Sequence, residues 1–243
     1  MIGVSITGVA TGNVMGLNFT EASRFVVEEN KRVANIIGIN PSARCTTIKP
    51  EGTSSLVLGT SSGLHAWHND YYIRRIRVGK NEAIYQYLKN RVPSIIEDDF
   101  FKPESIAIIS IPQKAPEGSI LRTESAISTL ERLKVLQEKW IYPGHNLGDN
   151  KNNVSCTISV RDDEWGNVGN WMWANKEKFT AIAVLPYDGG TYTQPPYEDI
   201  DAETYESLIG KLKSIDLSHV LEIEDKTDLQ SEAACAGGAC EVT

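Results

Sequence analysis

Apolar residues along this chain switch repeatedly between helical spacing and strand-like runs, and this alternation is the feature that most restricts its possible folds. Over residues 20–37 they recur at the steps of an amphipathic helix. Residues 106–111 form a short apolar run between two prolines, which is typical of a strand buried on both faces. A second helical pattern covers residues 123–140. The alternation predicts an α/β architecture.

The clearest strand pattern covers residues 153–160, where every second side chain is apolar. The apolar positions are Val154, Cys156, Ile158 and Val160, and Ser155, Thr157 and Ser159 lie between them. A strand with one polar face suits a barrel whose lumen admits a ligand.

The rest of the chain continues this alternation. A short helix capped by Asp162 or Asp163 is expected to carry Trp165, Val168, Trp171 and Met172. Residues 181–185 then read as a buried strand, and residues 202–212 as a last helix. We expect residues 1–221 to form the folded part, and residues 222–243, which are acidic and then rich in Gly and Ala, to form a flexible tail.

The formal net charge of −8 excludes several classes of partner. An acidic surface offers no basic stripe for nucleic acid or anionic lipid, so a phosphate ligand must be held locally. No apolar run is long enough to span a bilayer, and no signal peptide is apparent. These features favour a cytoplasmic protein that binds neither membrane nor nucleic acid.

The segment from Pro50 to Ser55 has the composition of an anion cradle. Gly52 permits close backbone approach, and the hydroxyls of Thr53, Ser54 and Ser55 can donate to phosphate oxygens. The order of residues is not that of a Walker A loop. An ordinary capped turn is the alternative reading.

Other chemically notable side chains have simpler structural explanations. His65 and His68 are interpreted as polar residues near Trp67 and not as metal ligands, and no metal site is expected. Arg74, Arg75 and Arg77 could bind an anion, but ion pairs within the protein are at least as reasonable. Cys45 and Cys156 are expected to be buried, as are the indoles of Trp165, Trp171 and Trp173.

Cys235 and Cys240 differ from the other cysteines because the Gly- and Ala-rich segment around them offers no core to pack into. Four small intervening residues allow a disulfide to close between them. An exposed dithiol of this kind can carry electrons by thiol–disulfide exchange. Two incidental thiols are the alternative reading.

Six motifs, taken in order, together resemble class II ribonucleoside-triphosphate reductases, which depend on adenosylcobalamin. They lie at residues 2–9, 49–55, 61–65, 71–77, 186–192 and 234–241, so the match runs in order along nearly the whole chain. The resemblance implies that Pro50, Glu51, Gly52, Thr53 and Ser54 bind substrate phosphates. It also implies that Cys235 and Cys240 re-reduce an active-site disulfide, with a thioredoxin-type protein as the external reductant.

The resemblance further implies a fold and a mechanism. The fold is the ten-stranded α/β barrel of ribonucleotide reductases and glycyl-radical enzymes, of which this chain would supply the C-terminal part. In that family adenosylcobalamin generates a thiyl radical on a finger-loop cysteine, and the thiyl begins reduction of the ribonucleoside diphosphate or triphosphate to a 2′-deoxyribonucleotide.

The finger-loop cysteine has no match here, because neither Cys45 nor Cys156 lies in its motif. We therefore expect a fragment, a split-gene half or a truncated reading frame, inactive without an N-terminal reductase portion that carries that cysteine. Two other functions remain open, namely a non-catalytic nucleotide-phosphate binding module and a small thiol–disulfide carrier. A neighbouring reading frame that carries the finger-loop cysteine would favour the split reductase.

Overall fold

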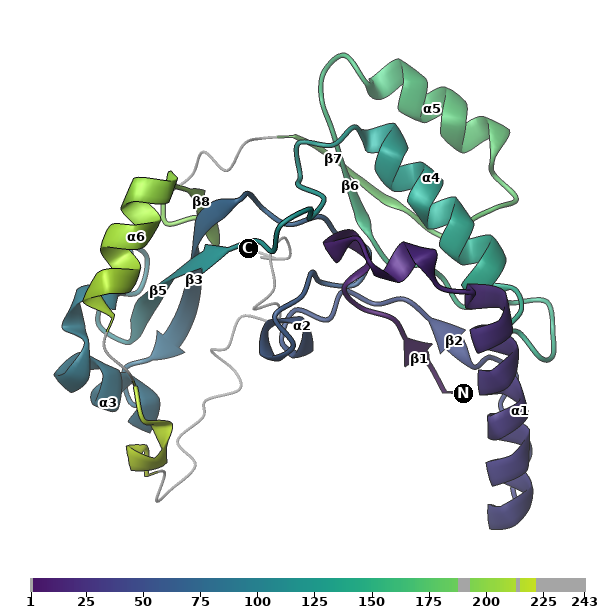
Figure 1. Ribbon diagram of the computed structural model, residues 1–243, viewed down its shortest axis with the longest axis horizontal. Helices are drawn as coiled ribbons and strands as arrows, with labels where there is room; N and C mark the ends of the chain where they lie inside the picture. The colour runs from purple at the N-terminus through teal and green to yellow at the C-terminus, as the bar shows by residue number, and fades with distance from the viewer. Residues whose placement is uncertain (1, 188–192, 213–214, 222–243) are drawn as a thin grey trace. The chain divides into compact units, whose positions relative to one another are not determined.

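The computed structural model describes residues 2–187, 193–212 and 215–221 (Figure 1). Within it the chain divides into two compact units. Unit 1 comprises Met1–Trp67 and Pro116–Tyr187, and unit 2 comprises His68–Ala115 and Asp188–Thr243. Cys235, Cys240 and the expected flexible tail lie outside the described residues. The assignment of residues 1–221 to one part of a barrel stays a prediction.

Unit 1 is built on short parallel strands. Strand β1 (Val4–Ser5) pairs with β2 (Thr46–Thr47), and β6 (Thr157–Val160) pairs with β7 (Ala183–Pro186), both in parallel. An isolated parallel bridge between Ile48 and Val154 connects the two pairs. The strands therefore follow one another in the order β1, β2, β6, β7, with their carboxyl ends at one edge.

Three longer helices accompany these strands: α1 (Phe19–Ile37), α4 (Ala126–Leu136) and α5 (Trp165–Ala174). One turn of π-helix, Gln137–Ile141, extends α4, and two single 3₁₀ turns, Val9–Thr11 and Val14–Gly16, precede α1. Asn18 caps α1 by accepting a hydrogen bond from the Glu21 amide, and Gly38 ends the helix in the left-handed conformation. The predicted helices at 20–37 and 123–140 are confirmed within a few residues.

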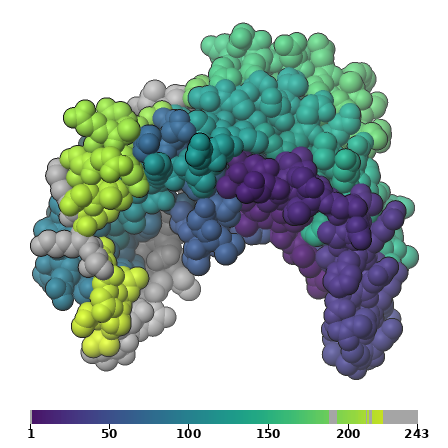
Figure 2. Space-filling model, in the orientation of Figure 1, coloured from purple at the N-terminus to yellow at the C-terminus, as the bar shows by residue number. Residues whose placement is uncertain are grey.

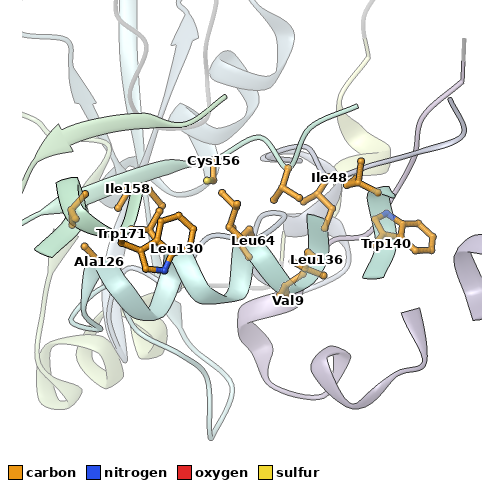
Figure 3. Close-up of a cluster of buried hydrophobic side chains, with 14 of the residues drawn as sticks. Val9, Ile48, Leu64, Ala126, Leu130, Leu136, Trp140, Cys156, Ile158 and Trp171 are labelled. Atoms are coloured by element: carbon orange, nitrogen blue, oxygen red, sulfur yellow. The ribbon is translucent and has the colours of Figure 1, made fainter. Parts of the chain in front are cut away.

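The apolar stripe of α4 forms the centre of the unit 1 core. Leu130, Leu133 and Leu136 are completely buried, and Figure 3 shows Leu130 and Leu136 beside Val9, Leu64 and Ile158. The predicted alternation over 153–160 is confirmed, because its four apolar side chains are at most 7% exposed. This core holds β6 against α4.

Unit 2 is a four-stranded antiparallel sheet with the order β4-β5-β3-β8. Its strands are β3 (Tyr71–Gly79), β4 (Ile96–Asp98), β5 (Ile106–Lys114) and β8 (Tyr197–Asp199). The helices of the unit are α3 (Ala83–Arg91) and α6 (Ala202–Lys211), with 3₁₀ turns at Pro93–Ile95 and Leu217–His219. A second core gathers between α3 and the sheet, around Val78, Tyr85, Leu88, Ala107 and Ile109.

Unit 2 confirms the predicted strand at 106–111 and extends it past Pro112. Strand β4 lies beside β5 only as far as Ile109, so the edge facing away from β3 carries no described strand at Pro112. A residue without an N–H group is tolerated at such a position. The predicted helix at 202–212 is also confirmed.

Three expectations for unit 1 are wrong. Strand β7 is largely exposed, with Leu185 at 45%, because it pairs only with β6 among the described strands. Trp165 and Trp173 are exposed at 42% and 75%, since only the Val168 and Trp171 side of α5 faces the core. The helix begins after Glu164, not after Asp162 or Asp163.

The side chain of Glu164 bonds to residues outside α5. Its carboxylate accepts hydrogen bonds from the amide of Arg161 at 3.1 Å and from the amide of Ala126, the first residue of α4, at 2.9 Å. Glu164 therefore satisfies a donor on a neighbouring helix, a partner that the local sequence does not reveal.

None of the described helices is long and apolar enough to cross a membrane.

Candidate phosphate-binding site

The segment Lys49–Thr53 connects the carboxyl end of β2 to the short helix α2 (Ser54–Val57). It therefore lies at the edge where the parallel strands of unit 1 end. In open and barrel-shaped α/β proteins this edge is where ligands bind. The structure confirms the predicted helical turn after the segment.

The donors of this segment point in different directions. Thr53 and Ser54 are exposed, whereas Ser55 is only 3% exposed and turns inward. The expectation that Ser55 contributes a hydroxyl to an anion is therefore wrong. The amides of Gly52, Thr53 and Ser54 donate no hydrogen bond to any described residue, as expected at the start of a helical turn. Three amides and two hydroxyls are thus free to meet an acceptor.

Hydrogen bonds to β1 and to the 3₁₀ turn that follows it hold both ends of the loop. At its start, the amide of Lys49 donates to the Ser5 hydroxyl at 3.1 Å. Beyond α2, the hydroxyl of Thr60 lies 2.9 Å from that of Thr11, which also accepts from the amide of Ser61. The loop is therefore fixed at its two ends by residues that are distant in sequence.

Gly63 lies directly against the start of the loop. Its φ of +54° is in the left-handed region, and an added Cβ would lie 2.4 Å from the carbonyl oxygen of Lys49. The Gly63 amide donates to the Thr7 hydroxyl at 2.8 Å, and its carbonyl accepts from the Val9 amide at 3.1 Å. Only glycine fits this position without moving Lys49 and Pro50.

The π-helical turn Gln137–Ile141 is hydrogen-bonded to β2. The indole of Trp140 donates to the carbonyl of Thr47 at 2.9 Å, and the Thr46 hydroxyl donates to the carbonyl of Trp140 at 2.7 Å. The side chain of Gln137 donates to the carbonyl of Asn152 and accepts from the amide of Val154. The Trp140 bonds fix the strand from which residues 49–54, the candidate phosphate loop, emerge, and the Gln137 bonds fix the segment before β6.

His65 contributes a contact that the sequence analysis missed. Its Nδ1 lies 3.2 Å from the carbonyl oxygen of Ser62, and its Nε2 accepts from the amide of Thr157 at 3.1 Å. Burial lowers the pKa of His65. The local sequence around His65 carries no signal of a partner more than ninety positions away.

His68 belongs to unit 2 and has a different environment. Its ring stacks on Tyr197 at a centroid distance of 5.0 Å and meets the edge of Tyr72, and its Nε2 lies 3.0 Å from Asp199. The expected packing near Trp67 is replaced by these tyrosines. Among the described residues, no three side chains of the metal-ligating types form a group.

The arginines of β3 pair within unit 2. Arg75 forms ion pairs with Glu97 and Glu198, and Arg77 pairs with Asp99 at 3.0 Å. Arg74 lies over the ring of Tyr197 at 5.7 Å. These contacts confirm the structural interpretation of the arginine cluster.

The two described cysteines are buried and unpaired, as predicted. Burial raises the pKa of the Cys156 thiol to about 12, and burial also raises the pKa of Cys45. Neither thiol has the low pKa of a reactive cysteine.

Comparisons with known proteins agree with the predicted resemblance. The chain is 27% identical over 226 residues to the adenosylcobalamin-dependent ribonucleoside-triphosphate reductase of Lactobacillus helveticus, and 29% identical to the enzyme of that name from Lactobacillus leichmannii. Each alignment covers 89% of this chain and 29% of the relative. No protein-family model matches the chain.

A solved structure gives the same result for the fold. The crystal structure of a B12-dependent class II ribonucleotide reductase superposes with a TM-score of 0.70 at 24% sequence identity, over 90% of this chain and 34% of that one. The mixed α/β fold of the chain therefore resembles that of a class II reductase. The chain spans less than a third of the length of the curated relatives named above.

Proposed function

We propose that this chain is the phosphate-holding part of an adenosylcobalamin-dependent reductase that converts ribonucleoside triphosphates or diphosphates to 2′-deoxyribonucleotides. The observation that carries the proposal is the candidate phosphate loop, where exposed hydroxyls and unpaired amides meet at the carboxyl edge of parallel strands. The names of the relatives favour the triphosphate.

In this proposal Pro50, Glu51 and Gly52 shape the loop, while Thr53 and Ser54 donate to phosphate oxygens. A hydrogen bond to a charged acceptor contributes more than a neutral one, so two hydroxyls and three amides can hold a polyanion on an acidic protein. The bound phosphates would orient the ribose toward the other catalytic groups of the complete enzyme.

Replacement of both Thr53 and Ser54 by Ala tests the loop. We expect tripolyphosphate to bind the double variant about a hundredfold or more weakly than the wild-type chain, because each of the two lost bonds to a charged acceptor costs about 1.5–3 kcal/mol when shielded from water. Isothermal titration calorimetry measures the change. Ser207→Ala, which removes an exposed hydroxyl from α6 in unit 2, is the control. Equal affinity in all three proteins would show that the loop is only a turn.

In this proposal the complete reductase also contains a part that corresponds to the remaining length of the relatives. Exposed apolar side chains on α1 support such a partner: Phe25 is 67% exposed, Ile36 69% and Ile37 60%. Figure 2 shows the C-terminal turns of α1 standing clear of the rest of unit 1. Exposed apolar groups gathered on one helix are typical of an interaction surface.

Strand β1 adds to that surface. It pairs with β2 on one side only among the described strands, and Ile2 and Val4 beside that edge are each 42% exposed. A further strand added here would continue the parallel order and bury both side chains. This arrangement supports the proposal that the strands of unit 1 form part of the ten-stranded barrel.

Reconstitution tests the partner. We expect the chain alone to form no deoxyribonucleotide, and we expect turnover when it is mixed with a segment that carries the finger-loop cysteine, together with adenosylcobalamin, dithiothreitol and ribonucleotide. Ile36→Glu should weaken complementation, whereas Phe101→Glu, an exposed aromatic residue of unit 2, should not. Tripolyphosphate binding without any complementation would favour the non-catalytic binding module.

Adenosylcobalamin would supply the radical chemistry of the complete enzyme. No arrangement of the described side chains identifies a corrin contact, so the proposal assigns none of them to the cofactor. Cys235 and Cys240 are proposed as the dithiol that reduces the active-site disulfide. Two electrons and two protons pass to that disulfide while these thiols close to their own, which a thioredoxin-type protein then reduces.

A further inference from the structure

We infer that His65, as the neutral imidazole with its proton on Nδ1, is a positioning residue that couples strand β6 to the candidate phosphate loop. The inference rests on the proposed function for the role of that loop, while the coupling itself is a statement about the structure of unit 1.

The hydrogen bonds of His65 determine its tautomer. The amide of Thr157 can only donate, so the Nε2 atom 3.1 Å away must be an unprotonated acceptor. The proton of the neutral ring then lies on Nδ1, which donates to the carbonyl oxygen of Ser62 at 3.2 Å. A doubly protonated ring would lose the bond to Thr157 and place a charge among buried groups.

The segment that contains His65 is held at its other end by the residues after β1. Ser61 accepts at its carbonyl from the Gly8 amide and the Thr7 hydroxyl, and its own hydroxyl accepts from the amide of Ala10 at 3.1 Å. Gly63 adds the bonds to Thr7 and Val9 described above. His65 supplies the connection of this segment to β6.

Gly63 packs against the start of the candidate phosphate loop and so connects the segment of His65 to it. Between Ser62 and His65 the backbone packs so closely on Lys49 and Pro50 that a Cβ on Gly63 would lie 2.4 Å from one carbonyl oxygen and 3.4 Å from the Pro50 Cα. A small shift of residues 62–65 must therefore displace the start of the loop. The amide of Ser155, just before β6, already donates to the carbonyl of Ile48, just before the loop, at 2.8 Å. Since Thr157 is the first residue of β6, the ring of His65 adds a second connection, which reaches the loop through Gly63.

Two substitutions separate this role from simple packing. In His65→Gln the side-chain oxygen can reach the position of Nε2 and accept from Thr157, whereas His65→Phe fills the space and accepts nothing. Hydrogen–deuterium exchange of the peptide that covers residues 49–55 reports on the loop directly. We expect exchange there to be about fivefold to tenfold faster in His65→Phe and close to wild type in His65→Gln.

Affinity for tripolyphosphate should follow the same order, with a loss of about fivefold in His65→Phe and recovery in His65→Gln. His68→Phe, the same substitution in unit 2, should leave the exchange of residues 49–55 unchanged. Exchange in a peptide from the core of α4 shows whether a variant has loosened the whole unit.

The inference is overturned if loop exchange is the same in His65→Phe as in the wild type, or if it rises equally in the loop and in α4. It is also overturned if His65→Gln behaves like His65→Phe. A wild-type chain that binds no tripolyphosphate would refute the phosphate role of the loop and not the coupling, because the exchange comparison decides the coupling without a ligand.

Discussion

Substitution of Gly63 by Ala tests most directly whether the packing of this residue shapes the candidate phosphate loop. Gly63 has a φ of +54°, a conformation that costs a residue with a Cβ about 1–2 kcal/mol. The added Cβ would also lie 2.4 Å from the carbonyl oxygen and 3.0 Å from the carbonyl carbon of Lys49. Relief of an overlap with backbone atoms costs about 1–3 kcal/mol more. The expected loss in the free energy of unfolding is therefore about 2–5 kcal/mol.

A second glycine separates the two contributions. Gly118 has a φ of +78°, but an added Cβ there would meet nothing within 4 Å. Gly118→Ala should therefore lose only the conformational part, about 1–2 kcal/mol. Urea denaturation of both variants measures the difference, which reports the overlap with Lys49.

The Gly63→Ala substitution should also change how the candidate phosphate loop binds tripolyphosphate. If Gly63→Ala relieves the overlap by moving Lys49 and Pro50, affinity for tripolyphosphate should fall, while Gly118→Ala retains it. A Gly63 variant that is no less stable than the Gly118 variant and binds tripolyphosphate equally well would refute the reasoning.

Three further predictions concern the cysteines and unit 2. In a reconstituted enzyme, Cys235→Ser should stop multiple turnover driven by thioredoxin but leave turnover driven by dithiothreitol largely intact, and an unchanged thioredoxin-driven rate would remove the proposed role of this thiol. Cys156, with a pKa of about 12, should remain unmodified by iodoacetamide at neutral pH until the chain is unfolded, and its rapid labelling in the folded chain would contradict the burial. Burial acts to raise the pKa of Asp99, but the Lys102 amide, the Arg77 guanidinium and the Phe101 amide outweigh it and hold the pKa below its usual value. The ionised form thus stabilises the fold above the unfolded pKa, and this contribution is lost as the pH falls through the folded pKa. Asp99→Asn should accordingly flatten the acid side of the stability profile, and an unchanged slope in urea titrations at several pH values would contradict this.

The sequence alone determined the helices and strands in which buried apolar side chains recur at regular spacing. The stripe of α4 and the alternation of β6 each indicate one apolar face packed against a core, and in each element that apolar face is buried as predicted. The candidate phosphate loop was visible for a related reason. The backbone preferences of a proline and a glycine, and the hydrogen bonding of neighbouring hydroxyls, are local properties that do not depend on the rest of the chain.

Tertiary structure alone decided which distant residues meet. Glu164 bonds to the first amide of α4, His65 to the first amide of β6, and Arg75 to carboxylates on two other strands. Strand β7 has the apolar sequence of a buried strand and yet is exposed, because a strand is buried by its neighbours and not by its own residues. A sequence pattern reports what a side chain prefers, but a hydrogen bond or a buried contact needs a partner, and the partners here lie tens of positions away along the chain.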